Sequence, residues 1–159
     1  MARILLVEDD GVLSEDLGHK LRGWGHEIDL ASDLSAAYDV IDRGRPQLIL
    51  SDISLPSGSG FDLLRHVGNR QFGLVETPVI LISAIDDKAS ILYGELCGAV
   101  DYLIKPVDYE VLKELIDQRL QGSRSWWTRT LLSEFFMLRT SRRGERKDPV
   151  QRSGFGMRR

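Results

Sequence analysis

The 159-residue chain is predicted to be an α/β protein in which helices cover both faces of a five-stranded parallel sheet. Three observations predict this class. Short runs of β-prone residues alternate five times with stretches in which apolar residues repeat at helical spacing. The strongest runs are continuously apolar, as in strands buried on both faces. Glycine and proline fall between the segments, where turns are expected.

The expected strands cover residues 4–7, 27–31, 48–50, 79–82 and 101–104. A helix is expected after each strand, and Asp108 is the expected N-cap of the last one. The apolar faces of the five helices are Leu13, Leu17, Leu21 and Trp24; Leu34, Ala37, Tyr38 and Ile41; Phe61, Leu64 and Val67; Ile91, Leu92 and Leu96; and Val111, Leu112, Leu115, Ile116 and Leu120.

The composition is that of a soluble globular protein, with 42% hydrophobic and 28% charged residues. No apolar run approaches the ~20 residues of a membrane helix. The N-terminus lacks the longer apolar core of a signal peptide. The single cysteine, Cys97, excludes an intramolecular disulfide and is compatible with a reducing compartment, so a cytoplasmic location is expected.

The charge is unevenly distributed along the chain. Residues 1–122 carry a net charge of −10, whereas residues 123–159 carry +7, within an overall charge of −3. Because an acidic body and a basic extension suit different partners, we expect them to be separate units.

Polar side chains follow four of the expected strands. Glu8, Asp9 and Asp10 come after the first, and Asp52 after the third. The fourth and fifth are followed by a hydroxyl and an ammonium group, those of Ser83 and Lys105. Since the carboxyl ends of parallel strands share one edge of the sheet, these groups are expected to meet there.

This set of groups suits phosphoryl transfer with Mg²⁺. Carboxylates are hard oxygen ligands, and they also act as nucleophiles toward phosphorus. An acid patch that merely caps helix N-termini is the plainer hypothesis. The occurrence of matching groups at four strand ends favours the site. A phosphatase of the haloacid dehalogenase type would carry a second Asp, its general acid, two residues after the nucleophile. This chain has Ser54 two residues after Asp52, so sustained phosphatase activity is disfavoured.

Residues 1–121 resemble the receiver domain of bacterial two-component response regulators. The motifs that carry the resemblance are LLVEDD, SDISLPSGSG around Asp52, LISA with Ser83, and DYLIKP with Lys105. The resemblance implies a flavodoxin-like fold with strand order 2-1-3-4-5. It also implies a phosphoacceptor signalling switch that promotes only its own phosphorylation and dephosphorylation.

The resemblance also implies a role for individual residues. Asp52 would be the phosphoacceptor, Asp10 a direct Mg²⁺ ligand, and Asp9 a ligand acting through metal-bound water. The backbone carbonyl of Ser54 would be a further ligand, and Glu8 would be incidental.

The remaining motif residues would serve the phosphoryl group and the switch. Lys105 would pair with the phosphoryl group, or with Asp52 before it arrives, and Ser83 would bond a phosphoryl oxygen. Tyr102 would be an aromatic switch, with a half-buried strand residue as the plainer alternative. Pro106 would follow a cis peptide bond.

The resemblance further implies a sensor histidine kinase or histidine phosphotransfer protein as donor, and an output through protein contacts. The output partner is a downstream protein or a second copy, reached through the face of the fourth and fifth helices. Two alternatives stay open: an adaptor that does not use phosphorylation, and a DNA-binding transcriptional regulator with a truncated output region.

The basic extension is divided in two. Residues 123–139 are predicted to form an amphipathic aromatic helix, and residues 140–159 to be disordered. A dimerisation or packing element is the favoured role for this helix, because large aromatic residues on a short helix need burial. Contact with a membrane or partner groove, contact with nucleic acid, and a degenerate remnant are the alternatives.

Overall fold

The computed structural model describes residues 1–44, 46–69 and 77–121. The expected helix over residues 123–139 and the basic segment 140–159 lie outside these residues. The elements are, in chain order, β1 (Arg3–Val7), α1 (Gly11–Gly23), β2 (Glu27–Ala31), α2 (Leu34–Gly44), β3 (Leu48–Asp52), β4 (Ser54–Leu55), β5 (Gly58–Ser59), α3 (Gly60–Asn69), β6 (Val79–Ser83), α4 (Lys88–Leu96), β7 (Asp101–Ile104) and α5 (Tyr109–Leu120).

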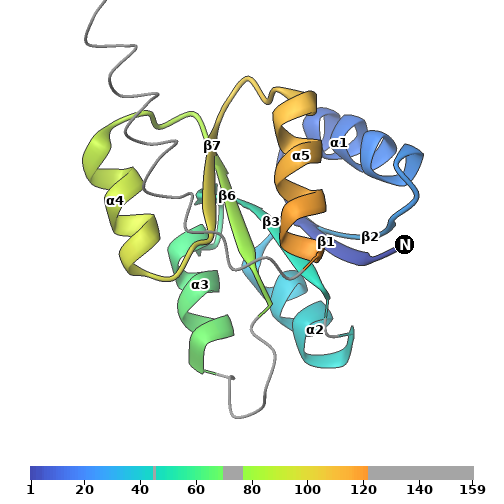
Figure 1. The fold of residues 1–159 in the computed structure, drawn as a ribbon. Coiled ribbons are helices and arrows are strands. Elements are labelled where there is room, and N and C mark those ends of the chain that lie inside the picture. Colours follow the sequence, from blue (N-terminus) through green and yellow to red (C-terminus); the bar gives the residue numbers. More distant parts are fainter. Residues whose placement is uncertain (45, 70–76, 122–159) are drawn as a thin grey trace, which may run out of the picture. The chain divides into compact units, whose positions relative to one another are not determined.

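The main sheet is parallel, and its strand order is β2-β1-β3-β6-β7 (Figure 1). With the five long strands numbered along the chain, this is the predicted order 2-1-3-4-5. The sequence analysis did not predict the short antiparallel hairpin of β4 and β5, whose two strands have two residues each.

Alternate strand residues point to opposite faces of the sheet, as the period of two requires. In β1, Leu5 and Val7 pack on the face covered by α2 and α3. Ile4 and Leu6 pack on the face covered by α1 and α5. The three central strands are therefore buried on both sides, which explains their continuously apolar sequence.

The strand register brings four carboxyl ends into line. Val7 pairs with Ser51, Asp52 with Ile82, and Ser83 with Ile104. Residues that follow β1, β3, β6 and β7 are thus held at one edge by a buried sheet. Asp108 caps α5 as predicted, because its side chain accepts hydrogen bonds from the backbone N–H groups of Glu110 and Val111.

Membrane-spanning length and apolarity are met by none of the helices within the described parts of the chain.

Candidate functional site

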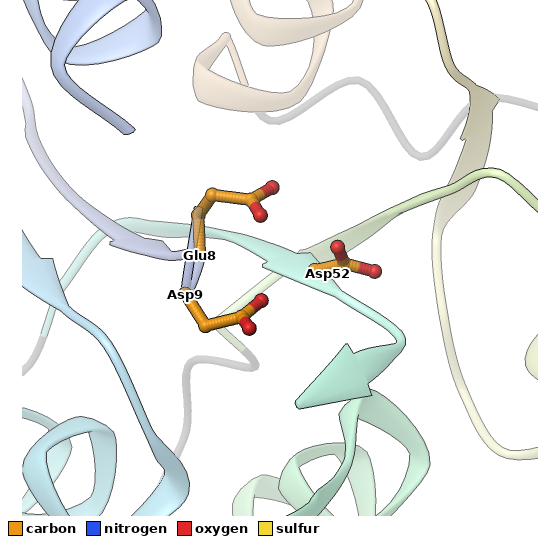
Figure 2. Close-up of side chains that lie close together, drawn as sticks. All are labelled: Glu8, Asp9 and Asp52. Carbon is orange, nitrogen blue, oxygen red and sulfur yellow. The ribbon is translucent and has the colours of Figure 1, made fainter. Parts of the chain in front are cut away.

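Three carboxylates converge at the shared edge of the sheet. Glu8 and Asp9 directly follow β1, and Asp52 ends β3. One oxygen from each lies within 4.8 Å of the others, and Figure 2 shows the Glu8 and Asp9 side chains extending from the end of β1 toward the side on which Asp52 lies. Asp9 is exposed, whereas Glu8 and Asp52 are only 3% and 6% exposed. The cluster is therefore buried on one side and open to solvent on the other.

Lys105 supplies the positive charge of the cluster. It follows β7, and its Nζ donates hydrogen bonds to Asp52 Oδ2 at 2.5 Å and to Glu8 Oε2 at 2.9 Å. Burial acts to lower the pKa of Lys105, but the bonds to the two carboxylates outweigh it and raise that pKa. The peptide bond between Lys105 and Pro106 is cis, as predicted.

Burial is the main influence on the pKa of Glu8. Its pKa is raised above the ordinary value because burial penalises the charged form, although the hydrogen bond from Lys105 opposes the shift. The backbone N–H of Asp10 donates to Glu8 Oε1 at 3.2 Å. Both oxygens of Glu8 therefore have a partner inside the site.

The backbone around Asp52 is held closely. The Ser54 N–H donates to Asp52 Oδ1 at 2.9 Å, and the Ser51 hydroxyl donates to the Asp52 carbonyl at 2.8 Å. Gly60, the first residue of α3, approaches that carbonyl so closely that a Cβ there would lie 2.6 Å from its oxygen. The orientation of the Asp52 carboxylate thus depends on β3, on the turn after it and on the start of α3.

Ser83 and Tyr102 meet at one loop residue beyond β6. The buried Ser83 hydroxyl accepts a hydrogen bond from the Ile85 N–H at 3.0 Å, and the Tyr102 hydroxyl donates to the Ile85 carbonyl at 2.8 Å. Partial burial raises the pKa of Tyr102. Ser83 and Tyr102 therefore share Ile85 as a hydrogen-bond partner.

The structure corrects the position predicted for Asp10. Its Oδ1 accepts hydrogen bonds from the backbone N–H groups of Val12 and Leu13, at 2.9 and 3.2 Å, so it caps α1. The carboxylate found in the cluster is that of Glu8, which the sequence analysis set aside. The sequence does contain a signal for this capping role. Asp10 lies three residues before Leu13, the first apolar residue of the predicted helical face, which is where an N-cap is expected.

The donor set fits a hard divalent cation. Mg²⁺ takes carboxylate and carbonyl oxygens and keeps several waters, which the exposed side at Asp9 accommodates. The structure brings Glu8, Asp9, Asp52 and Lys105 together. The carbonyl of Ser54 was predicted to be a further ligand. In the structure, the backbone N–H of Ser54 donates a hydrogen bond to Asp52.

The family model described as "Response regulator receiver domain" matches residues 4–117. Among curated proteins, PilH of Pseudomonas aeruginosa is 32% identical over 122 residues, which cover 77% of this chain and 100% of PilH. The transcriptional regulatory protein CrdR of Helicobacter pylori is 36% identical over 114 residues, covering 72% of this chain and 53% of CrdR. The matched region spans about half or less of most of the curated relatives.

Solved structures of response regulators have the same fold. A two-component response regulator from Clostridium difficile superposes with a TM-score of 0.72 at 29% identity, covering 79% of this chain and 100% of that one. The BeF₃-activated receiver domain of Klebsiella pneumoniae RstA has a TM-score of 0.68 at 27% identity, covering 74% of this chain and 97% of that one. Fold, acidic cluster and sequence match lead to one conclusion: the chain belongs to the family of response regulator receiver domains.

Proposed function

We propose that the chain accepts a phosphoryl group on Asp52 in a Mg²⁺-dependent reaction and that this modification switches its protein contacts. Receiver domains are phosphoacceptor signalling switches, not conventional enzymes. Membership of this family implies that the chain has a cognate kinase. The observation that carries the proposal is the convergence of the Glu8, Asp9 and Asp52 carboxylates beside the ammonium of Lys105. The donor is a sensor histidine kinase or a histidine phosphotransfer protein, and the location is the cytoplasm.

The transfer begins with the Asp52 carboxylate as nucleophile. A carboxylate oxygen forms a bond to phosphorus while the bond from phosphorus to the donor imidazole nitrogen breaks, and the electron pair returns to that nitrogen. Glu8, Asp9, Asp52 and the Ser54 carbonyl are the proposed Mg²⁺ ligands. The metal would offset the negative charge that the carboxylate and the transferred oxygens bring together.

Two groups of the chain then act on the phosphoryl oxygens. Lys105 already lies within hydrogen-bond distance of Asp52 and supplies a point charge to the incoming group. The buried Ser83 hydroxyl, now an acceptor from Ile85, donates to a phosphoryl oxygen after it moves. Tyr102 is hydrogen-bonded to the same loop residue, Ile85. A rearrangement of Tyr102 would therefore transmit the modification of Asp52 to the protein surface.

The proposed output is a protein contact on the face of α4 and α5. Helix α4 exposes Leu92, Tyr93 and Leu96 to 56%, 49% and 77%, and Gly94 is its buried residue. A helix that exposes three large apolar side chains and buries only a glycine suits a surface that a downstream protein or a second copy covers. Dimerisation through residues 123–139 is a further proposal, as are nucleic-acid contact through the basic segment and a truncated DNA-binding output.

The test is phosphorylation by a small donor. Incubation with Mg²⁺ and acetyl phosphate should add one phosphoryl group, measured by intact mass, and chelation of the metal should prevent it. Asp52→Asn should abolish the adduct. Asp39→Asn is the matched control, because Asp39 lies on the exposed surface of α2 and pairs with Arg43. An adduct that persists in Asp52→Asn would refute the assignment, and an adaptor that does not use phosphorylation would form none.

A further inference from the structure

The hairpin of β4 and β5 lies in the chain between Asp52 and α3. Ser54, the first residue of β4, donates its backbone N–H to Asp52 Oδ1 at 2.9 Å. Two residue pairs join the strands, Ser54 with Ser59 and Leu55 with Gly58. Because so short a hairpin is at best marginally stable by itself, contacts with the rest of the fold must hold it in place. The position of the hairpin therefore influences how the Asp52 carboxylate is held.

Each strand of the hairpin has its own anchor. Leu55 of β4 is 7% exposed and packs in the core on the face of the sheet that α2 and α3 cover. The Ser59 N–H of β5 donates to Asp62 Oδ2 of α3 at 2.9 Å. Neither of these two contacts involves the turn between the strands, residues 56–57.

Ser57 fastens this turn to α2. Its hydroxyl oxygen accepts a hydrogen bond from the Leu34 N–H at 3.0 Å, although the two residues are 23 positions apart in the chain. Leu34 is the first residue of α2, and its N–H is one of the four that a helix cannot satisfy internally. The carboxylate of Asp33, the preceding residue, accepts from the Ala36 N–H instead. The Leu34 N–H thus takes its acceptor from the hairpin.

The packing beside this hydrogen bond is close. Gly58 has a φ of +149°, and a Cβ added there would lie only 2.7 Å from Leu34 Cδ1. Leu34 is 6% exposed, whereas Ser57 is exposed. The turn is therefore not held by burial of the Ser57 side chain, and its hydroxyl can be removed without opening the core.

We propose that Ser57 is a positioning residue for the phosphorylation site: its hydrogen bond to the start of α2 fixes the hairpin, and the hairpin fixes Ser54 beside Asp52. The consequence for the reaction rests on the proposed function, in which the Ser54 carbonyl is a Mg²⁺ ligand. Without the bond, the hairpin occupies its correct position for a smaller fraction of the time. The apparent affinity for Mg²⁺ falls with that fraction.

Amide hydrogen exchange of the metal-free full chain, followed by NMR, tests the positioning separately from the reaction. In Ser57→Ala the Ser54 amide should exchange about threefold to tenfold faster than in the parent, the effect of losing one hydrogen bond. Ser57→Thr keeps the hydroxyl and should exchange at nearly the parent rate. Ser35→Ala is the matched control, since Ser35 is an exposed serine next to Leu34, and it should leave the Ser54 amide unchanged.

The same variants are then titrated with Mg²⁺ by calorimetry and phosphorylated with acetyl phosphate. Ser57→Ala should bind Mg²⁺ about threefold to tenfold more weakly than the parent. At a subsaturating Mg²⁺ concentration it should also gain its phosphoryl group more slowly. Ser57→Thr and Ser35→Ala should match the parent in both measurements.

A role limited to capping α2 gives a different result. Ser57→Ala would then speed exchange of the Leu34 amide and lower the stability to denaturant, while the Ser54 amide and the Mg²⁺ affinity kept their parent values. That result overturns the inference. It is also overturned if Ser35→Ala has the same effects, or if Ser57→Thr fails to restore the parent values.

Failure of the proposed function looks different again. In that case the Asp52 residue of the parent protein gains no phosphoryl group at saturating Mg²⁺. The exchange rate of the Ser54 amide in the metal-free variants still decides whether Ser57 positions the hairpin.

Discussion

At the scale of single residues, neighbouring acids of one triplet have separate tasks. Glu8 is buried and bound to Lys105, Asp9 is exposed at the open side of the cluster, and Asp10 caps α1. The sequence analysis expected Asp9 and Asp10 to act as the metal pair. Three carboxylates in succession look alike in the sequence, but the end of β1 and the first turn of α1 present them in different directions.

The first prediction concerns Asp10. Asp10→Ala should destabilise the fold by about 1 kcal/mol, because two backbone N–H groups at the start of α1 lose their acceptor. Its Mg²⁺ affinity should fall far less than that of Asp9→Ala. Denaturant unfolding and calorimetric titration measure the two effects.

Asp10→Ser is the matched control, because serine also caps helices and so should retain most of the stability. If Asp10→Ala instead abolished Mg²⁺ binding while Asp9→Ala preserved it, Asp10 would be the ligand and the cluster containing Glu8 would be wrong.

At the scale of elements, the start of α3 determines how Asp52 is held. Helix α3 can approach the end of β3 only because Gly60 has no side chain: an added Cβ would lie 2.6 Å from the Asp52 carbonyl oxygen and 3.1 Å from Leu81 Cδ2. The Gly60 N–H also donates to the Ile53 carbonyl at 2.9 Å. The sequence motif placed a glycine in this loop, but the contact that requires it is visible only in the structure.

The second prediction uses two glycines of α3. Gly60→Ala should destabilise the protein by about 2 kcal/mol, since the added methyl group must displace backbone atoms. It should also slow phosphorylation of Asp52 by acetyl phosphate. The same substitution at Gly68, where an added Cβ meets nothing within 4 Å, should stabilise the protein by up to about 1 kcal/mol. Equal effects of the two substitutions on unfolding would refute the proposed contact.

At the scale of the whole molecule, His26 lies where distant parts of the chain meet. It directly precedes β2, and the N-terminal amine and Lys113 and Asp117 of α5 act on its charge. Its Nδ1 is buried and, among the described residues, has no hydrogen-bond partner. Burial, helped by the N-terminal amine, lowers the pKa of His26 below its ordinary value of 6.5.

The third prediction follows from the sign of that shift. The unfolded chain binds the proton of His26 more readily than the folded protein does, so stability rises with pH in this range. The contribution is fully present above about pH 6.5 and is lost as the pH falls through the lower pKa of the folded state. Denaturant unfolding between pH 5 and 7.5 measures it, with pH values chosen about the ordinary histidine pKa.

His26→Gln should flatten this pH dependence, because glutamine does not titrate. His19→Gln is the control, since it makes the same substitution at a histidine that is exposed on α1. An unchanged slope in His26→Gln would show that another group causes the dependence.

Much of the fold and part of the site follow from the sequence alone. Runs of β-prone residues, the strongest of them continuously apolar, predicted all five long strands, because strands buried on both faces need apolar side chains at every position. The period of 3.6 predicted the helices after them. The rule for carboxyl ends predicted that Asp52, Ser83 and Lys105 would gather at one edge. The β4–β5 hairpin was missed, because two-residue strands are too short to leave a pattern.

The sequence by itself determined the order of the elements, the edge that carries the chemistry and the types of group present there. Only the tertiary structure decided that Glu8 joins the cluster while Asp10 caps a helix, and that Lys105 bridges Glu8 and Asp52. The physical reason is that the pattern of apolar residues is a local property of the chain, and it indicates only which side chains are buried. Which carboxylate faces a lysine 97 residues away depends on strand register and on where a helix begins, and both are fixed only when the sheet assembles.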